Sequence, residues 1–490
     1  MLYTDAAVIG AGVLGCFTAR ALTELEISVT VIEEKEDVCT GITRANTGII
    51  YTGCDNRPGS RKAAMCVKAN REFDQLARGL DVRFSRCGSV MAAFGPRGED
   101  VLRRKYRQGL SNGVPGLRLL SRDELAEAEP LLSRDAVLGL YAPGTGTVEP
   151  WELGIAAFEN ASANGALFRL NEKVIHMERS GSRFILETDR ETILARTVIN
   201  CAGLSADAVR EMLRVPAVRI FPTGADYIVL GDSLKGQIRH VIFHEPEEKR
   251  KGLTIVPAVD GSILAGPTER SADLAPEGAT CAEGLEELRK LCAEVVPDLP
   301  LTEQIRTFSA LRPNPRSVQR ENGRWVPVDH SIRDFLILNE DGLISLIGIK
   351  TPGLTCAAEL GRFCASLAAG ALSGPGRNRH FNPRRTGIPR VHEMKENDRA
   401  ALIRTDPDFG EIVCQCHDVT AGEIREAIRR GAVTPDGVKR RTGAGMGVCQ
   451  GCRCISRVQA MLTGMRKNAP QTDSPGHSGT EKPEERHGIY

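Results

Sequence analysis

The 490-residue chain has few aromatic residues, almost no net charge and no long apolar run. Its formal net charge is +1, so no overall electric field favours nucleic acid or an acidic lipid surface as a partner. No stretch of about 18 apolar residues occurs, and we therefore expect no transmembrane segment. The first residues enter a strand without a basic leader, which argues against a secretory signal peptide.

Cysteine, by contrast, is plentiful, with fifteen residues spread along the chain. Without a secretory signal these thiols indicate a reducing, cytoplasmic location, with most of them acting as small buried hydrophobic groups. The chain is too long for one core, so two or three domains are expected. Its 41% hydrophobic and 26% charged content is ordinary for a globular protein.

A glycine-rich turn lies close to the N-terminus. A short apolar strand leads into Gly10-Ala-Gly12-Val-Leu-Gly15, and a helix and a second strand follow. In such a unit the first glycine allows a tight turn, the second admits a pyrophosphate, and the third lets helix pack on strand. Glu33 ends the second strand, where an acid can hold ribose hydroxyls. The pattern predicts a dinucleotide site; a glycine turn in an unrelated α/β fold is the alternative.

Four cysteines near the other end form two tight pairs, Cys414-x-Cys416 and Cys449-x-x-Cys452. Two such thiolate pairs suit a [2Fe–2S] cluster, which takes four cysteine ligands. Structural zinc, which can also take four cysteines, and a reactive thiol pair are the alternatives. Cys454 is a fifth nearby thiol, interpreted as a bystander.

A helix is expected directly after the first cysteine pair. Thr420 with Glu423 three residues later forms the pattern of a capping box. The first pair should therefore lie at a helix N-terminus, where backbone N–H groups can stabilise thiolates.

Four segments resemble those that contact the flavin in the D-amino-acid-oxidase-like flavoproteins. They are Thr40–Gly53, Gly144–Pro150, Asn200–Gly203 and Gly348–Thr355. The resemblance covers roughly residues 5–370 and implies FAD as the dinucleotide. The implied FAD-binding residues are Gly10, Gly12, Gly15, Glu33, Thr40, Gly41, Asn46, Thr47, Gly48, Val174, Ala202, Gly203, Gly348, Lys350, Gly353, Leu354 and Thr355.

The expected fold class is α/β. It consists of a Rossmann-like FAD-binding domain with an inserted sheet-rich α+β substrate domain, plus a small C-terminal helical [2Fe–2S] domain. The expected ranges are 1–80, 150–215 and 331–375 for the FAD-binding domain, 81–149 and 216–330 for the substrate or cap domain, 376–410 for a linker, 411–466 for the [2Fe–2S] domain and 467–490 for a disordered tail.

The order of these domains resembles the anaerobic type of the FAD-dependent glycerol-3-phosphate dehydrogenase family. The run from Val413 to Gly451 is similar to that family's C-terminal domain. The spacing of Cys449-x-x-Cys452, however, resembles that in bacterioferritin-associated ferredoxin. The resemblance implies oxidation of glycerol 3-phosphate by hydride transfer to FAD. Electrons would then pass through a [2Fe–2S] centre to a partner flavoprotein or electron-transfer subunit, with possible peripheral membrane association through that partner.

The residues expected to meet the substrate leave its identity open. Arg312 in Ser309-Ala-Leu-Arg312-Pro and Lys350 match basic residues of the dehydrogenase family. Ala45 stands where that family has arginine, and Tyr51 where it has histidine. The stretch around Tyr51 also resembles relatives that oxidise 2-hydroxyglutarate, so a 2-hydroxy acid is the alternative substrate.

Alcohol oxidation needs a base that takes the hydroxyl proton as hydride leaves. His330 is the first candidate and His244 the second, while Tyr51 could orient the substrate. Oxidation of an amino or imino acid, and a redox module without catalysis, are weaker readings of the same chain.

Overall fold

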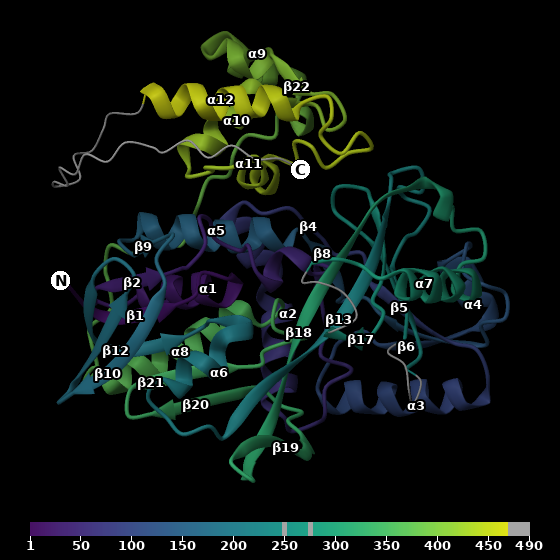
Figure 1. Cartoon of the computed structure of the whole chain (residues 1–490). Coiled ribbons are helices and arrows are strands. Elements are labelled where there is room, and N and C mark those ends of the chain that lie inside the picture. The colour runs from purple at the N-terminus through teal and green to yellow at the C-terminus, as the bar shows by residue number, and fades with distance from the viewer. Residues whose placement is uncertain (247–251, 273–277, 469–490) are drawn as a thin grey trace, which may run out of the picture.

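The computed structural model describes residues 1–246, 252–272 and 278–468, including the side chains apart from those of 329–331 and 466–468. His330 lies in a strand, but its side chain is outside the described set, as is nearly all of the expected tail 467–490. Figure 1 shows two large β-rich bodies side by side and a small helical body packed against them. The α/β fold expected from the sequence is confirmed. None of the helices in the described ranges is long and apolar enough to cross a membrane.

A parallel sheet forms the centre of the first body. The glycine turn joins its middle strand to a helix, and its parallel order is β9-β2-β1-β12-β21. These strands are β1 (Leu2–Ile9), β2 (Val29–Ile32), β9 (Leu167–Arg169), β12 (Thr192–Asn200) and β21 (Leu343–Ile347). The strands β1, β12 and β21 are far apart in the sequence, but their carboxyl ends lie side by side at one edge of the sheet. Open α/β sheets bind ligands at this edge.

Antiparallel strands and helices complete this first body. β10 (Val174–Ser180) and β11 (Arg183–Thr188) extend the sheet from β12, and β20 (Leu336–Glu340) pairs with β21. Its helices are α1 (Val13–Leu22), α2 (Arg61–Leu80), α5 (Pro150–Ala163), α6 (Ala206–Glu211) and α8 (Ala357–Ala371). Apolar side chains of α1, α5 and α8 join those of β1 in one buried cluster. Burial of this face, rather than helix propensity alone, holds these helices in place.

A ten-stranded, largely antiparallel sheet forms the second body. Its strand order is β19-β18-β13-β16-β15-β14-β5-β7-β6, and β17 pairs with β13. The strands are β5 (Ser89–Ala93), β6 (Arg118–Ser121), β7 (Leu138–Ala142), β13 (Val218–Leu230), β14 (Val241–His244), β15 (Thr254–Pro257), β16 (Ile263–Gly266), β17 (Arg270–Ser271), β18 (Gln304–Glu321) and β19 (Arg324–Ser331). Its helices are α3 (Pro96–Ser111), α4 (Arg122–Ala128) and α7 (Ala282–Val295).

A three-stranded sheet lies between the two bodies. It consists of β3 (Ile49–Ile50), β8 (Gly146–Val148) and β4 (Phe84–Ser85), with β8 in the middle. Gly48, just before β3, has φ +71°, and a Cβ there would lie 2.1 Å from the carbonyl oxygen of Val148. Only glycine therefore fits where these two strands approach.

The C-terminal body is small and mostly helical. It comprises β22 (Ile412–Cys414), β23 (Val419–Thr420), α10 (Ala421–Arg429), α11 (Pro435–Thr442) and α12 (Ile455–Asn468). The expected capping box is present, because Thr420 Oγ1 accepts from the Glu423 N–H and Glu423 accepts from the Thr420 N–H. Figure 1 shows α11 lying against α5 of the first body.

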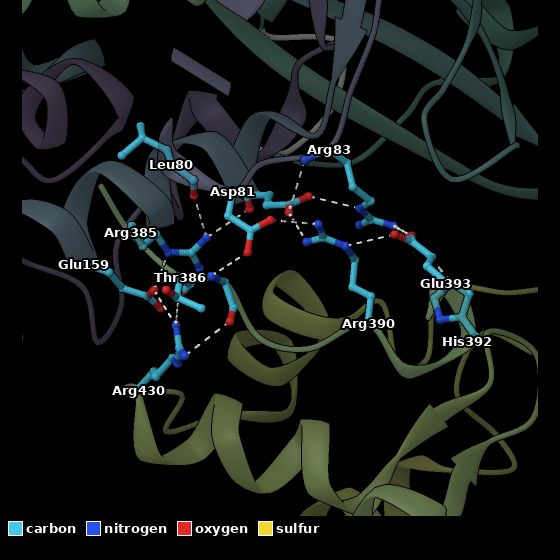
Figure 2. A network of polar contacts seen from close by, with 12 residues as sticks. Leu80, Asp81, Arg83, Glu159, Arg385, Thr386, Arg390, His392, Glu393 and Arg430 are labelled. Atoms are coloured by element: carbon cyan, nitrogen blue, oxygen red, sulfur yellow. Dashed lines mark hydrogen bonds and ion pairs between the residues drawn. The ribbon is translucent and has the colours of Figure 1, made fainter. Parts of the chain in front are cut away.

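The segment 376–410, expected as a linker, is not a loose connection. It contains α9 (Glu396–Thr405), and Arg385 and Arg390 tie it to the first body. Arg385 donates to Glu159 of α5 and to the carbonyl of Leu80, while Arg390 pairs with Asp81 and Glu152 (Figure 2). The partners of these two arginines lie on segments far away in the sequence, so only the folded chain reveals them.

Candidate functional site

The glycine turn is shaped by close backbone contacts. Gly10 has φ +96° and donates its N–H to the Ile32 carbonyl at 2.8 Å. A Cβ on Gly15 would lie 1.9 Å from the Gly10 carbonyl oxygen, so no other residue fits there. Gly12 is the N-cap of α1 and makes no side-chain hydrogen bond to it, so the N–H groups beyond the first residue of the helix can face an anion. The turn therefore has the geometry that a bound pyrophosphate requires.

Glu33 lies beside this turn, as expected. Its carboxylate accepts hydrogen bonds from the Ala11 N–H at 2.7 Å and the Lys35 N–H at 3.0 Å. Burial raises its pKa above the ordinary value. Each carboxylate oxygen can accept a further bond, so the side chain can still hold ribose hydroxyls. Glu172 donates its N–H to the Glu33 carbonyl, and this brings Val174 near the same end of the sheet.

The segment carrying Thr40, Gly41, Asn46, Thr47 and Gly48 lies against the turn. The short helix η1 (Ile42–Ala45) interrupts it, and Asn46 Oδ1 accepts from the Gly48 N–H at 2.9 Å. Sequence reasoning missed the contact that fixes the segment. Thr43 Oγ1 accepts from the N–H of the first residue of α1 at 3.1 Å. A threonine amid these glycines was the available signal.

The remaining expected flavin residues come from two other strand ends. Ala202 and Gly203 follow β12, and a Cβ on Gly10 would approach the Cys201 carbonyl at 2.7 Å. The loop after β21 carries the other group, namely Gly348, Lys350, Gly353, Leu354 and Thr355. There Thr355 Oγ1 accepts from the Tyr51 N–H at 3.0 Å. Segments at the start, middle and end of the chain thus converge on one edge of the parallel sheet. Which of them touch FAD stays a prediction.

Arg312 and Lys350 come together across the boundary between the first two bodies. Arg312 lies on β18, and its buried Nη1 has no hydrogen-bond partner among the described residues. Lys350 Nζ donates to Asn314 Oδ1, and Asn314 donates to Thr223 at 2.9 Å. Burial, and then the charge of Arg312, lower the pKa of Lys350. A half-buried guanidinium with one unpartnered nitrogen, beside a partly desolvated ammonium, is suited to an anionic substrate group.

A third cation, Lys62, joins this pair and was missed by sequence reasoning. It lies in the first turn of α2, and its Nζ stands 5.2 Å from the centre of the Phe335 ring. Burial lowers the pKa of Lys62, and the charge of Lys350 lowers it further. The run Ser60-Arg-Lys did not mark Lys62 as a substrate residue, because only the fold brings the start of α2 to the loop after β21.

Tyr51 lies close to Arg312 and so belongs to the same group of residues. Its ring lies 6.0 Å from that of Phe243 on β14. Burial raises the pKa of the Tyr51 hydroxyl, Asp55 raises it further, and Arg312 opposes the shift. The hydroxyl therefore stays protonated at neutral pH, which makes it a hydrogen-bond donor rather than a base.

His244 is not brought to this group. It follows Phe243 on β14, and successive strand residues face opposite sides. Its ring stacks on Phe94 at 5.0 Å, and its Nδ1 lies 2.7 Å from the Glu245 carbonyl oxygen. These contacts explain His244 as a packed structural residue. The base assigned to His330 stays a prediction.

Glu149 is a buried acid within the segment Gly144–Pro150. It is the N-cap residue of α5 and directly follows the last residue of β8. Burial raises its pKa to about 8, with Asp260 also raising it and Arg83 opposing the shift. The carboxyl is therefore largely protonated at neutral pH.

The cysteines gather at one end of the C-terminal body. The backbone N–H groups of Arg453 and Gly451 lower the pKa of Cys449 to about 7, and the Cys416 and Cys452 side chains also contact it. A thiol with so low a pKa is suited to act as a thiolate ligand.

Cys454 is closer to the group than a bystander would be. It is buried, as is Cys414, whose thiol contacts it. Burial, and then Cys414, raise the pKa of Cys454 to about 11. Within the described ranges no three or more potential ligands are already arranged to hold a metal ion. The assignment of Cys414, Cys416, Cys449 and Cys452 as the iron ligands stays a prediction.

Comparison with known families accounts for both ends of the chain. Residues 5–367 match the FAD dependent oxidoreductase family, and residues 412–463 match the BFD-like [2Fe-2S] binding domain. The chain belongs to the FAD-dependent oxidoreductase family. The two matches identify FAD and a [2Fe–2S] cluster as its cofactors.

Individual relatives agree with this assignment. A glycerol 3-phosphate dehydrogenase of Caloramator mitchellensis is 36% identical over 94% of this chain and 93% of its own. The human mitochondrial L-2-hydroxyglutarate dehydrogenase is 28% identical, but over 54% of this chain and 60% of its own.

Solved structures share the fold. An FAD-bound L-alpha-glycerophosphate oxidase of Mycoplasma pneumoniae matches with a TM-score of 0.70 and 21% identity, covering 79% of this chain and 99% of that one. A glycerol-3-phosphate dehydrogenase of Bacillus halodurans complexed with FAD matches with a TM-score of 0.64 and 16% identity over 96% of this chain and 92% of that one.

Proposed function

We propose that this oxidoreductase converts glycerol 3-phosphate to dihydroxyacetone phosphate and passes the electrons to a separate redox protein through its [2Fe–2S] domain. One observation carries the proposal: the 36% identical dehydrogenase aligns over 94% of the chain, which includes the cysteine domain. The partly buried cations Arg312, Lys350 and Lys62 support it, since a phosphate dianion offsets several positive charges at once.

The side chains divide the work. Arg312 presents an unpartnered N–H to the anionic group, and Lys350, held by Asn314, adds a point charge. Tyr51 donates a hydrogen bond that orients the substrate. When bound, FAD accepts the hydride from the alcohol carbon, and the hydroxyl proton must go to a base, for which His330 is our candidate.

Anaerobic titration tests this proposal. Glycerol 3-phosphate should bleach the flavin absorbance of the purified protein, whereas L-2-hydroxyglutarate at the same concentration should not. Bleaching by the hydroxy acid alone would instead assign the second candidate function. Tyr51 and Ala45 favour that alternative, because they depart from the dehydrogenase pattern. If no small donor reduces the flavin, the chain is a redox module without its own substrate.

A second experiment tests the path of the electrons. Cys449→Ser should leave flavin reduction by substrate intact but stop reduction of a one-electron acceptor such as cytochrome c. Cys292→Ser, a buried thiol in the second body, is the matched control and should transfer electrons normally. Normal transfer by the Cys449 variant would contradict the relay. We further propose that the acceptor is a partner protein in the cytoplasm or at the inner face of the membrane.

A further inference from the structure

One buried aspartate joins the first body to the C-terminal body, beside a second ion pair between Arg430 and Glu159. Asp37 accepts from Arg441 through both of its carboxylate oxygens, at 2.8 and 2.7 Å, and from Arg440 at 2.7 Å. The side chains of Asp37 and Arg441 are each 1% exposed and that of Arg440 is 9% exposed. A bidentate pair of this kind is directional, and losing one partner leaves the other charge buried and unpaired.

The helix that carries these arginines has a recess for the carboxylate. Arg440 and Arg441 occupy the last turn of α11, one turn after Gly437. A Cβ on Gly437 would lie 3.2 Å from Asp37 Oδ2, which is tighter than ordinary contact. The aspartate therefore sits against bare backbone with a guanidinium on each side, so the fit depends on this one orientation of α11.

Asp37 also belongs to the segment that is expected to hold FAD. It lies between Glu33 and the stretch that begins at Thr40. This segment is bonded to the glycine turn on both sides of the aspartate. The Glu33 carboxylate accepts from the Ala11 N–H at 2.7 Å, and the Cys39 N–H donates to the Ala11 carbonyl at 3.0 Å. A displacement of Asp37 would be transmitted directly to these bonds.

We propose that Asp37 is a positioning residue that couples FAD binding to docking of the [2Fe–2S] domain. When Arg440 and Arg441 hold Asp37, the segment is already ordered and FAD binds more tightly. Bound FAD orders the same segment and so strengthens docking, because the effects of two linked equilibria are reciprocal. The proposal requires FAD but no particular substrate.

The affinity for FAD in a variant of the distant domain tests this coupling. Arg441→Gln, in the C-terminal body, should raise the dissociation constant for FAD about tenfold in fluorescence titrations of apoprotein. Arg429→Gln is the matched control, since this arginine is exposed and pairs with Glu426 on its own helix. It should bind FAD as the wild type does. An unchanged dissociation constant in Arg441→Gln would overturn the proposal.

The double variant separates coupling from general damage. If Asp37 and Arg441 act as one unit, Asp37→Asn with Arg441→Gln should weaken FAD binding no more than either change alone. Independent destabilisation would instead multiply the two effects, and that result would contradict the coupling.

The effect of FAD on docking of the [2Fe–2S] domain can be tested in the wild-type protein. In the wild-type protein, FAD should slow trypsin cleavage within the segment 376–410 severalfold, with half-protection at the FAD dissociation constant, and Arg441→Gln should lose this protection. A cleavage rate independent of FAD would overturn the proposal.

Discussion

The proposed flavin site has a dinucleotide end and a substrate end, and these two ends are built by different means. At the dinucleotide end, backbone groups and bare glycines create the shape, as Gly10 and Gly15 illustrate. At the substrate end, charged side chains from separate bodies meet, as Arg312 and Lys350 do. Backbone shape tolerates almost no change of residue, whereas charge can be exchanged between neighbouring positions. The comparison predicts that cofactor binding and substrate binding differ in their tolerance to substitution.

The largest effect should come from filling the backbone contact at the dinucleotide end. Gly15→Ala places a methyl group where only 1.9 Å separates it from the Gly10 carbonyl oxygen, so the turn must open. We expect the purified protein to retain less than about a tenth of its FAD. Gly370→Ala, in α8, is the control, because nothing lies within 4 Å of its added methyl. Full FAD absorbance in the Gly15 variant would break the comparison.

Removing one charge at the substrate end should spare the cofactor. Arg312→Ala is expected to lower kcat/KM about 100-fold, mainly through KM, with FAD content unchanged. The exposed Arg320, on the same strand, provides the control variant Arg320→Ala. Steady-state kinetics with an artificial acceptor measure both. Loss of FAD together with activity would show that the two ends are not separable.

A smaller effect is expected for the third cation. Lys62→Met removes a charge but keeps the length of the side chain beside Phe335, so KM should rise about fivefold. Lys68→Met on the same helix is the matched control, because Lys68 pairs with Glu359 instead. A KM equal to that of the wild type would exclude Lys62 from the residues that bind the substrate.

The smallest expected effect concerns stability and depends on pH. The pKa of Glu149 is about 8 in the folded chain, above the ordinary 4.5, so folding holds a proton that the unfolded chain releases. Stability from this group therefore falls as pH rises between these values. Glu149→Gln, which mimics the protonated form, should raise Tm by about 3 °C at pH 9 and by less at pH 6. An equal shift at both pH values would refute the assignment. The exposed Glu127→Gln is the control.

The sequence allowed much of the dinucleotide end to be predicted. The glycine turn, the strand ends and the loops after them follow from residue types that backbone geometry requires, and their order along the chain is fixed. Lys62 and Asp37 were not predictable, because lysine and aspartate fit any exposed surface. Their roles arise when α2 meets the loop after β21 and when α11 meets the first body.

The charged strip formed by Arg385 and Arg390 has a consequence for how fast the two cofactor-bearing parts communicate. Because the segment that contains Arg385 and Arg390 is bonded to the first body, the [2Fe–2S] domain does not have to diffuse between an electron donor and an electron acceptor, as a mobile carrier domain must. Transfer within one chain should then be indifferent to the viscosity of the medium. Glycerol or sucrose would slow only the encounter with the external acceptor.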